Sequence, residues 1–483
     1  MPNGGDGRVR RTKIVATLGP ASDDVATIRD LIRAGVDVFR LNYSHGSHES
    51  QGATLARVRE ASAEVGREVG ILQDLAGPKI RTGDMAEGAS IELTEGESVI
   101  LDREPGPMRA GHVTANVPHV ADELQVGDRV LLSDGRLELV MEERGHDGCR
   151  MRVVRGGTLS ARSGINLPAT KLSIPAMTEK DRADLEHGIS LGADMTALSF
   201  VRQARDLEGP RSVAERLGRS LFLIAKIEKP EAIENLDEIL ERADGVMVAR
   251  GDLGVEVAPE EVPLLQKRII RAANRRRIPV ITATQMLESM IKSSVPTRAE
   301  ASDVANAIFD GTDAVMLSGE TATGDHPVQV VRTMVRIAEK SDGPALPPAR
   351  RRQRGTPVEP PLAVAQAATQ VAEDVDARAI VVYTESGATA RLLASHRPAV
   401  PILALAPDLE TVRRLRLSWG VFPRLMPRVE RLAEMLVVGE RILLEAEQVR
   451  LGDRVVVVSG TRAANRGGTN MLKVLTVGEM DEG

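Results

Sequence analysis

The middle of this chain repeats one order of segments: a short apolar run, a polar cluster, and a stretch with helical periodicity. Short continuous apolar runs are typical of strands buried on both faces, as in a parallel sheet. Helical segments such as residues 261–273 and 298–309 separate the runs. Strands that alternate with helices predict an α/β fold with helices on the faces of a parallel sheet. The four runs are residues 221–224, 245–248, 279–281 and 314–317.

Four further runs complete a set of eight strands, the number that a closed (β/α)8 TIM barrel needs. They are residues 13–17, 36–41, 70–75 and 194–199. In this fold the catalytic groups come from the carboxyl ends of several strands. Here those ends carry a lysine, two carboxylates, an arginine, threonines and a serine. Such a set suits an anionic substrate that is handled together with a metal ion.

The barrel pattern is interrupted once and is followed by a second α/β region. We expect the barrel to comprise residues 1–81 and 173–343, because residues 82–172 show short alternating stretches and turn signals instead. That texture predicts a small inserted β domain. Residues 344–361 are rich in proline and arginine and predict a linker. Residues 362–483 predict a C-terminal α/β domain with strands at 378–383, 401–405, 454–458 and 471–477.

Composition excludes several classes of protein. Hydrophobic residues make up 42% and charged residues 27% of the chain, as in a soluble globular protein. A net charge of −6 and an aromatic content of 2% argue against nucleic-acid and membrane partners. Cys149 is the only cysteine, and no apolar run approaches the roughly 18 residues that span a membrane. We therefore expect a cytoplasmic protein.

Nine stretches, in chain order, resemble pyruvate kinase, and together they are far more specific than any one alone. They include Lys-Ile-Glu at 226–228 and Met-Val-Ala-Arg-Gly-Asp-Leu-Gly at 247–254. The resemblance implies a TIM barrel, a small β-barrel lid, a C-terminal regulatory domain and a homotetramer. It implies phosphoryl transfer from phosphoenolpyruvate to ADP, which gives pyruvate and ATP. The other stretches are residues 12–22, 40–46, 77–83, 164–168, 284–290, 296–306 and 316–321.

The resemblance assigns the divalent metal and its neighbour. Glu228 and Asp252 would hold Mg²⁺ or Mn²⁺ through carboxylate oxygens, the ligands that these ions prefer. Lys226 would be the electrophile that stabilises charge on the phosphoryl group and on the enolate oxygen. Taken singly, these side chains could instead be surface carboxylates and a structural lysine. Their common position at strand ends favours the functional interpretation.

The same resemblance assigns the groups that bind the rest of phosphoenolpyruvate. Arg40 and Arg81 would clamp the phosphate, because guanidinium geometry suits phosphate. Arg250, Gly251 and Asp252 begin a turn whose backbone N–H groups would receive the substrate carboxylate. Glycine at that turn allows close approach of the substrate to the backbone.

Protonation of the enolate carbon is assigned less sharply. By resemblance Thr284 lies near that carbon and works through water, and Ser318 and Glu320 feed the proton relay. Threonine is a poor acid, so its position must matter more than its pKa. A hydroxyl that only satisfies a strand end is the alternative for Thr284.

Nucleotide binding is assigned to the strand ends and the lid. Arg40 and His45 would lie on the ADP side, and Asp134 would approach the nucleotide-bound metal. Many relatives carry a lysine directly before Gly-Ile-Asn-Leu-Pro, where this chain has Ser163. Arg162 is the expected replacement. The chain has no G-x-x-x-x-G-K-[ST] phosphate loop, so a P-loop enzyme is excluded.

A monovalent-cation site is the point where this chain departs from its relatives. In many pyruvate kinases K⁺ lies near the residues that match Asn42, Ser44, Asp74 and the next backbone carbonyl. Those relatives usually have threonine and glutamate where this chain has Leu75 and Lys79. The ammonium of Lys79 would supply the charge of the ion. We therefore expect K⁺ not to be required, the alternative being a weakened K⁺ site with Lys79 in solvent.

The C-terminal region has two glycine-bearing loops that could cradle a phosphate. The first contains Thr384, Ser386, Gly387 and Thr389 and opens a helix, and the second spans residues 459–470. Relatives bind phosphorylated activators at this place. Two ordinary turns are the alternative.

Two other functions share parts of this pattern. A lyase or aldolase acting on phosphoenolpyruvate or pyruvate also uses a barrel, metal carboxylates and an arginine, but it needs neither a lid nor ADP. A catalytically inactive metabolite sensor would be expected to lose Lys226, Glu228, Asp252 or Arg40, and all four are present.

Overall fold

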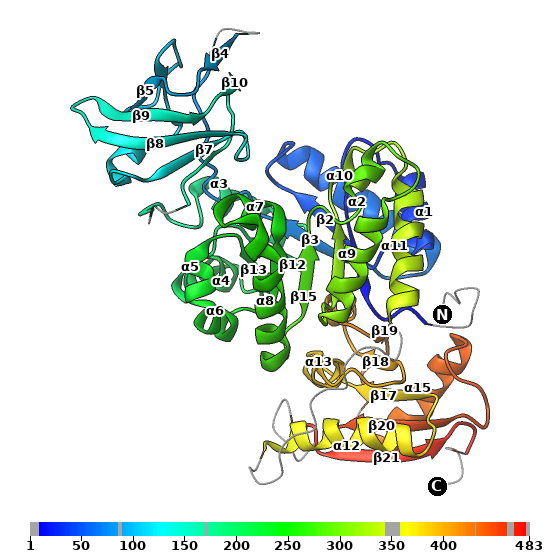
Figure 1. Ribbon diagram of the computed structural model, residues 1–483. Helices are drawn as coiled ribbons and strands as arrows, with labels where there is room; N and C mark the ends of the chain where they lie inside the picture. The colour runs from blue at the N-terminus through cyan, green and yellow to red at the C-terminus, as the bar shows by residue number, and fades with distance from the viewer. Residues whose placement is uncertain are drawn as a thin grey trace.

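Eight parallel strands close into a barrel in the order β1-β16-β15-β14-β13-β12-β3-β2 (Figure 1). The computed structural model describes residues 9–85, 89–168, 170, 172–342, 358–429, 431–460 and 468–479. All eight predicted strands are present, with ends that shift by at most three residues. They are β1 (Lys13–Thr17), β2 (Val38–Asn42), β3 (Gly70–Asp74), β12 (Met195–Leu198), β13 (Leu223–Ile227), β14 (Gly245–Ala249), β15 (Val280–Ala283) and β16 (Ala314–Leu317).

Helices surround the barrel because each strand is buried on both faces. Capping boxes explain where two of them begin: Thr178 accepts the N–H of Asp181, and Thr297 accepts the N–H of Glu300. The longer helices are α1 (Val25–Ala34), α2 (His48–Val65), α3 (Glu179–Ser190), α4 (Glu208–Arg216), α8 (Val262–Arg276), α9 (Arg298–Phe309) and α11 (Pro327–Ser341). Short helices and 3₁₀ turns follow several strands: η2 (Ala204–Leu207), α5 (Pro230–Glu234), α6 (Leu236–Arg242), α7 (Arg250–Glu256), η3 (Pro259–Glu261), η4 (Glu288–Ile291) and α10 (Gly319–Ala322).

The insertion after β3 is an all-β lid that stands away from the barrel on a narrow neck (Figure 1). Its described strands form a six-stranded sheet, β11-β7-β8-β9-β5-β6, and a two-stranded sheet, β10-β4, rather than one closed cylinder. An apolar core of its own, with Leu101, Leu139 and Met151, lies within it. Its elements are β4 (Ser90–Leu93), β5 (Ser98–Asp102), β6 (His112–Val113), η1 (Val120–Glu123), β7 (Arg129–Leu132), β8 (Leu137–Arg144), β9 (Gly148–Arg155), β10 (Gly157–Ser160) and β11 (Ile165–Asn166).

The C-terminal domain is a five-stranded sheet in the order β19-β18-β17-β20-β21, with helices against it. The four strands expected there are present, and β19 is an additional edge strand that contains Pro423. The expected linker, residues 344–361, lies largely outside the described residues. The elements are α12 (Pro360–Asp374), β17 (Ala379–Tyr383), α13 (Ala388–Ser395), β18 (Ile402–Ala406), α14 (Leu409–Leu415), β19 (Val421–Leu425), α15 (Leu432–Glu445), β20 (Arg454–Ser459) and β21 (Met471–Thr476).

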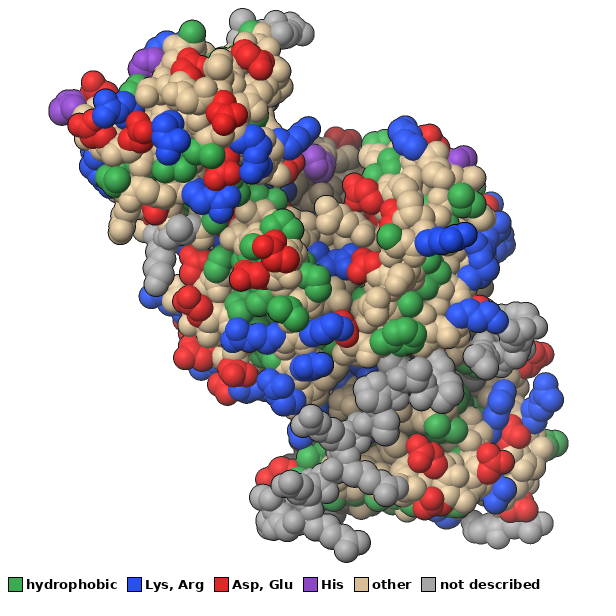
Figure 2. Space-filling model, viewed as in Figure 1, with side chains coloured by type: hydrophobic (Ala, Val, Ile, Leu, Met, Phe, Trp, Pro, Cys, Tyr) green, Lys and Arg blue, Asp and Glu red, His purple; other side chains and the backbone are tan. Residues whose placement is uncertain are grey.

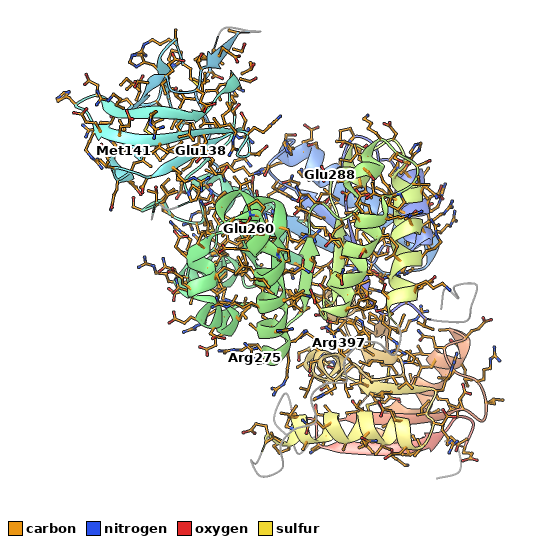
Figure 3. The ribbon with its side chains drawn as sticks, in the orientation of Figure 1. Glu138, Met141, Glu260, Arg275, Glu288 and Arg397 are labelled. Carbon is orange, nitrogen blue, oxygen red and sulfur yellow. The ribbon has the colours of Figure 1, made fainter. Side chains whose placement is uncertain are left out.

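This domain closes the barrel at the amino ends of its strands. Leu417 belongs to the apolar cluster inside the barrel, where it joins Val15, Leu72 and Ile224. Arg397 lies where the two domains meet (Figure 3) and forms a buried ion pair of 3.0 Å with Asp313, directly before β16. The lid and the C-terminal domain therefore occupy opposite ends of the barrel.

Basic and acidic side chains are interspersed over the face shown in Figure 2, with no broad basic patch on it. In the part of the chain that the structure describes, every helix is too short or too polar to cross a bilayer. The expected cytoplasmic location stays a prediction.

Candidate active site

Lys226, at the end of β13, is the centre of the polar cluster at the carboxyl end of the barrel. Its side chain is 9% exposed. The ammonium nitrogen lies 2.8 Å from Glu228 Oε1 and 3.3 Å from Asp74 Oδ1, and it donates to Ser199 Oγ at 2.7 Å. The ends of three strands, β3, β12 and β13, thus meet at one lysine, as the barrel pattern predicted.

Arg40 extends the cluster toward β1 and β2. Its Nε donates to Asp74 Oδ2 at 2.6 Å, and a terminal nitrogen donates to Thr17 Oγ1 at 3.1 Å. Burial raises the pKa of Asp74, but Lys226 and Arg40 outweigh it and hold that pKa below its usual value. Asp74 is therefore an ionised carboxylate between two cations.

The pKa of Glu228 is shifted in the opposite direction to that of Asp74, above its usual value. Its side chain is 2% exposed, and its Oε2 accepts the backbone N–H of Phe200 at 2.8 Å. Burial raises the pKa of Glu228, and the charge of Asp252 adds to this effect against the opposing influence of Lys226. Burial lowers the pKa of Lys226, but Asp74, Glu228 and Asp252 raise it above its usual value. The negative charges of Glu228 and Asp252 thus act on each other, with Lys226 beside Glu228.

Two interacting carboxylates fit a divalent cation. Carboxylate oxygens from Glu228 and Asp252 are suitable ligands for Mg²⁺ or Mn²⁺, which commonly bind one or two carboxylates plus substrate oxygens. Among the described residues, no group of three or more His, Cys, Asp or Glu side chains could hold a metal by itself. The residues therefore suit a metal whose coordination is completed by substrate and water.

Thr284 lies on a strained turn after β15. Thr284 and Gln285 have positive φ angles of 67° and 53°, which residues other than glycine rarely adopt. The Thr284 hydroxyl accepts the N–H of Gly251 at 2.7 Å and donates to the carbonyl of Ala283 at 2.6 Å. The hydroxyl is therefore fixed beside the turn that begins α7.

Arg250 holds this strained turn in place. Its guanidinium donates to the carbonyl oxygens of Thr284 at 2.8 Å and Gln285 at 3.2 Å, and it pairs with Asp303 at 2.7 Å. The donors of the Arg250 guanidinium are thus engaged by protein groups, and the expected substrate contact at Arg250 stays a prediction. Arg250 acts on the site by supporting Thr284.

Ser318 and Glu320 lie on the turn after β16. The buried carboxylate of Glu320 accepts the N–H groups of Ser318 at 2.7 Å and Leu287 at 3.1 Å, so it stabilises two turns. The Ser318 hydroxyl is buried without a hydrogen-bond partner among the described residues. Of the two expected relay groups, Ser318 has a hydroxyl left to exchange a proton and Glu320 has a structural task.

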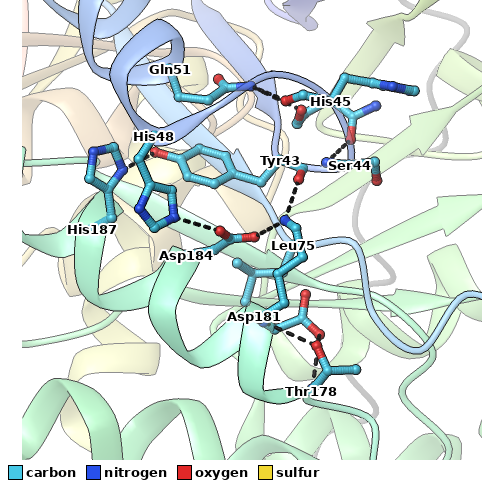
Figure 4. A network of polar contacts seen from close by, with 12 residues as sticks. Tyr43, Ser44, His45, His48, Gln51, Leu75, Thr178, Asp181, Asp184 and His187 are labelled. Carbon is cyan, nitrogen blue, oxygen red and sulfur yellow. Dashed lines mark hydrogen bonds and ion pairs between the residues drawn. The ribbon is translucent and has the colours of Figure 1, made fainter.

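The loop after β2 is fixed by contacts with α2 and α3 (Figure 4). Lys180 donates to the carbonyl of Tyr43 at 2.9 Å and pairs with Asp184 at 2.5 Å. Gln51 donates to the carbonyl of His45 at 2.8 Å. The backbone of this loop is therefore held independently of any ligand.

Two histidines stack behind the loop (Figure 4). The rings of His48 and His187 are 4.3 Å apart and nearly parallel, and the Tyr43 hydroxyl contacts His187 Nδ1 at 3.2 Å. His48 Nε2 contacts Asp184 Oδ1 at 2.7 Å. Burial and the neighbouring His48 lower the pKa of His187.

Cationic side chains surround the exposed His45. Burial lowers its pKa, and Lys79, Arg81 and Arg40 lower it further, which places three positive charges nearby. Arg81 lies at the entry to the lid, where its N–H donates to Asn116 Oδ1 at 2.8 Å. An assembly of this sign attracts a polyanion.

The residues of the expected monovalent-cation site converge. Lys79 Nζ donates to Ser44 Oγ at 3.1 Å, and the N–H of Ser44 donates to Asn42 Oδ1 at 3.1 Å. Lys79 is an exposed residue; partial desolvation and Lys226 lower its pKa, with Asp252 and Asp74 opposing them. Leu75 is buried, and its carbonyl accepts the Ser199 hydroxyl at 2.8 Å.

The expected lid residues lie on two adjacent turns. Asp134 is in the turn between β7 and β8, and a Cβ on the next residue, Gly135, would lie 3.7 Å from Val255 of α7. Arg162 pairs with Asp84 within the lid, so its charge already has a partner. The lid turn therefore approaches the barrel, while the nucleotide contact of Arg162 stays a prediction.

The two expected loops of the C-terminal domain meet. Thr389 Oγ1 lies 2.6 Å from Thr469 Oγ1, and residues 461–467 of the second loop lie outside the described residues. Gly387, with a φ of 77°, donates its N–H to the Thr384 hydroxyl at 3.0 Å. Arg391 donates to the carbonyl of Ser386 at 3.2 Å.

Sequence reasoning missed Thr17, Ser199 and Phe200. Thr17 and Ser199 are polar residues at strand ends, the same signal that pointed to Lys226. Phe200 acts through its backbone N–H and has a positive φ of 56°, and no side-chain pattern gives such information.

Comparisons with known proteins agree with this geometry. Family models described as pyruvate kinase, barrel domain, and pyruvate kinase, alpha/beta domain, match residues 9–331 and 362–475. A pyruvate kinase of Methylorubrum extorquens is 45% identical over 472 residues, which cover 97% of this chain and 98% of the relative. A pyruvate kinase of Mycobacterium tuberculosis is 45% identical over 479 residues, which cover 98% and 99%.

A solved structure of a pyruvate kinase from Cryptosporidium parvum superposes with a TM-score of 0.90 at 35% identity. The match covers 97% of this chain and 96% of that one. The fold and the order of the barrel and the alpha/beta domain are thus those of a known enzyme family. The chain belongs to the pyruvate kinase family of phosphotransferases.

Proposed function

We propose that this enzyme transfers the phosphoryl group of phosphoenolpyruvate to ADP, forming pyruvate and ATP, with Mg²⁺ or Mn²⁺ at Glu228 and Asp252. The observation that carries the proposal is the contact of Lys226 with both Glu228 and Asp74, beside Arg40. The metal would supply Lewis-acid stabilisation of the substrate oxygens. Phosphate binding, charge stabilisation and protonation are assigned to side chains of the protein itself.

Arg40 and Arg81 bind the phosphate, and Lys226 stabilises the charge that develops on the phosphoryl and enolate oxygens. Preorganised charge of this kind is usually the largest single contribution to catalysis. The Gly251 N–H donates to the Thr284 hydroxyl, so a substrate carboxylate at the Gly251–Asp252 backbone would take the place of that bond. Thr284, through water, and the unpartnered hydroxyl of Ser318 deliver the proton to the enolate carbon.

The test is ADP-dependent pyruvate formation by the purified protein, followed through lactate dehydrogenase. The proposal expects turnover that requires both ADP and a divalent cation and that disappears with excess chelator. Pyruvate released from phosphoenolpyruvate without ADP, together with inorganic phosphate, would instead identify a phosphatase. No turnover with either metal, from a folded preparation, would contradict the proposal.

The enzyme works without K⁺ because the ammonium of Lys79 takes the place of the ion. The support is the bond from Lys79 to Ser44 and the nearby charges of Asp74 and Asp252. Lys79 is exposed and solvent screens its charge, so the bond to Ser44 is the observation that supports the proposal.

A phosphorylated metabolite activates the enzyme from the loop with Thr384, Ser386, Gly387 and Thr389. The support is that this hydroxyl-rich loop opens α13 and meets Thr469. Ser386→Asp puts an anion where the phosphate belongs, and activation by a panel of sugar phosphates and nucleoside monophosphates should vanish. Unchanged activation in that variant would exclude the loop. The homotetramer is tested by light scattering of the purified enzyme.

A further inference from the structure

A buried ion pair, Lys229 with Glu256, joins the two segments that carry the carboxylates for the divalent cation. Lys229 Nζ is 2.6 Å from Glu256 Oε1, and the side chains are 7% and 1% exposed. Lys229 follows Glu228 in the sequence, and Glu256 lies four residues after Asp252, at the end of α7. The pair therefore ties the end of β13 to the end of α7.

The same pair reaches Glu228 by a second route. The ammonium of Lys229 lies 5.7 Å from the centroid of the Phe200 ring, a distance at which a cation is attracted to an aromatic face. Phe200 has a positive φ of 56° and donates its N–H to Glu228 Oε2. A strained residue needs its surroundings to hold it. Lys229 is one group that holds Phe200, and through it the carboxylate of Glu228.

Both chain crossings between barrel and lid touch this assembly. On the return crossing, Asn166 of β11 donates to Glu256 Oε1 at 2.9 Å, the oxygen that also binds Lys229. On the outward crossing, Gly77 packs against the Phe200 ring so closely that a Cβ there would lie 2.8 Å from it. The other oxygen of Glu256 is buried with no hydrogen-bond partner among the described residues. Losing Asn166 would therefore leave Glu256 with Lys229 alone.

We infer that Lys229 and Glu256 are positioning residues that brace Glu228 against Asp252, and that Asn166 makes this brace depend on the lid. The inference rests on the proposed metal site. It assigns no contact with substrate to the three residues. It means that the affinity of the free enzyme for a divalent cation is set partly by the attachment of the lid.

The test measures Mn²⁺ binding to the enzyme without substrates, by electron paramagnetic resonance of free Mn²⁺. Lys229→Met keeps the length of the side chain and removes its charge, and the Kd for Mn²⁺ should rise at least tenfold. Lys229→Arg keeps the charge and should restore the Kd to within about threefold of wild type. Lys267→Met, which breaks the ion pair with Asp310 on the barrel wall, is the matched control and should leave the Kd unchanged.

Asn166→Ala tests the link to the lid and guards against a Lys229→Met protein that does not fold. By itself it should raise the Kd about three- to fivefold, and in the Lys229→Met background it should add nothing, because groups that act as one unit are not additive. An unchanged Kd in either single variant, or effects that multiply in the double variant, would overturn the inference.

Wild-type pyruvate formation, measured on the same preparations, separates this inference from the proposed function. If the wild type turns over but the Kd for Mn²⁺ is unchanged in Lys229→Met, the bracing role is wrong and the proposed function stands. A wild-type protein that neither binds Mn²⁺ nor forms pyruvate would contradict both the bracing role and the proposed function.

Discussion

The two ends of the barrel are covered in different ways. At the amino end the C-terminal domain is docked: Leu417 joins the apolar core of the barrel, Arg397 pairs with Asp313, and Lys13 donates to the carbonyl of Val421. At the carboxyl end the lid is joined by two crossings, with Asn166 on one of them bound to Glu256. The closed end is packed against a second domain and the open end carries the polar cluster around Lys226, a division expected in this fold.

The charged side chains at the two ends of the barrel also have different neighbours. Trp419, at the closed end, lies under Arg397 at 4.8 Å and Arg11 at 5.4 Å, so these cations are held by an aromatic ring of the docked domain. At the open end, Glu228 and Asp252 are two interacting carboxylates beside Lys226. Substitutions at the open end should therefore change turnover by powers of ten, and those at the closed end should change stability.

Lys226→Met should show the largest effect on turnover. Loss of one preorganised group of this kind lowers kcat by about 10²–10³-fold. Steady-state pyruvate formation measures it, with Lys267→Met as the control. A variant that keeps more than about a tenth of wild-type turnover would contradict the role of Lys226.

The same variant should also lose stability, in contrast to what a strand-end lysine suggests from sequence. Lys226 is buried between Asp74 and Glu228, and removing one partner of a buried ion pair typically costs about 3–5 kcal/mol. Thermal unfolding without divalent metal measures the loss, and saturating Mg²⁺ should recover part of it. A melting temperature that does not respond to Mg²⁺ would argue against the metal site.

Leu417→Ala should destabilise the closed end without changing the chemistry. Truncation of a buried leucine typically costs about 2–5 kcal/mol, and Leu417 is fully buried. Urea unfolding measures the cost, and fluorescence of Trp419, the only tryptophan, reports the dock directly. Turnover at 25 °C should stay within about twofold. Leu264→Ala, at an exposed leucine, is the control. If Leu417→Ala lost as much turnover as Lys226→Met, the contrast between the two ends would be wrong.

Acid should loosen the closed end through His396. Burial, with Arg277 nearby, lowers the pKa of His396 from 6.5 to about 4. The unfolded chain takes up a proton on this side chain below pH 6.5 and the folded chain does not, so the free energy of unfolding falls as the pH drops from 6.5 to 4. The loss is about 3 kcal/mol at most. The difference between wild type and His396→Gln should shrink over this window, and a constant difference would exclude His396.

The smallest expected effect is stimulation by K⁺, which should stay below about twofold. Turnover is measured with tetramethylammonium as the only other monovalent cation, at fixed ionic strength. Lys79→Glu should create a requirement for K⁺, because it restores the residue type of the K⁺-dependent relatives. A severalfold stimulation of the wild type would show that Lys79 does not replace the ion.

Most of the barrel could be predicted from sequence because each strand is a buried apolar run and its polar end marks the site. Lys226, Glu228 and Arg40 were found in this way. The edge strand β19 was missed, because Pro423 and Arg424 interrupt its apolar pattern and an edge strand tolerates both.

Side-chain direction was the part that sequence could not supply. Arg250 and Glu320 sit in the right clusters, but their charged groups bind backbone atoms of neighbouring turns. Lys229 and Glu256 are far apart in the sequence and gave no local signal. Their contact depends on how α7 packs at the end of β13.

The most direct test of the division between the two ends is ATP formed in a single turnover, by quenched flow at 25 °C, in Lys226→Met and Leu417→Ala. The folded fraction of each preparation at 25 °C is taken from its own unfolding curve. The account predicts that Lys226→Met loses the ATP burst, and that Leu417→Ala keeps the full burst despite a lower melting temperature. A full burst in Lys226→Met, or a burst lost in folded Leu417→Ala, would contradict it.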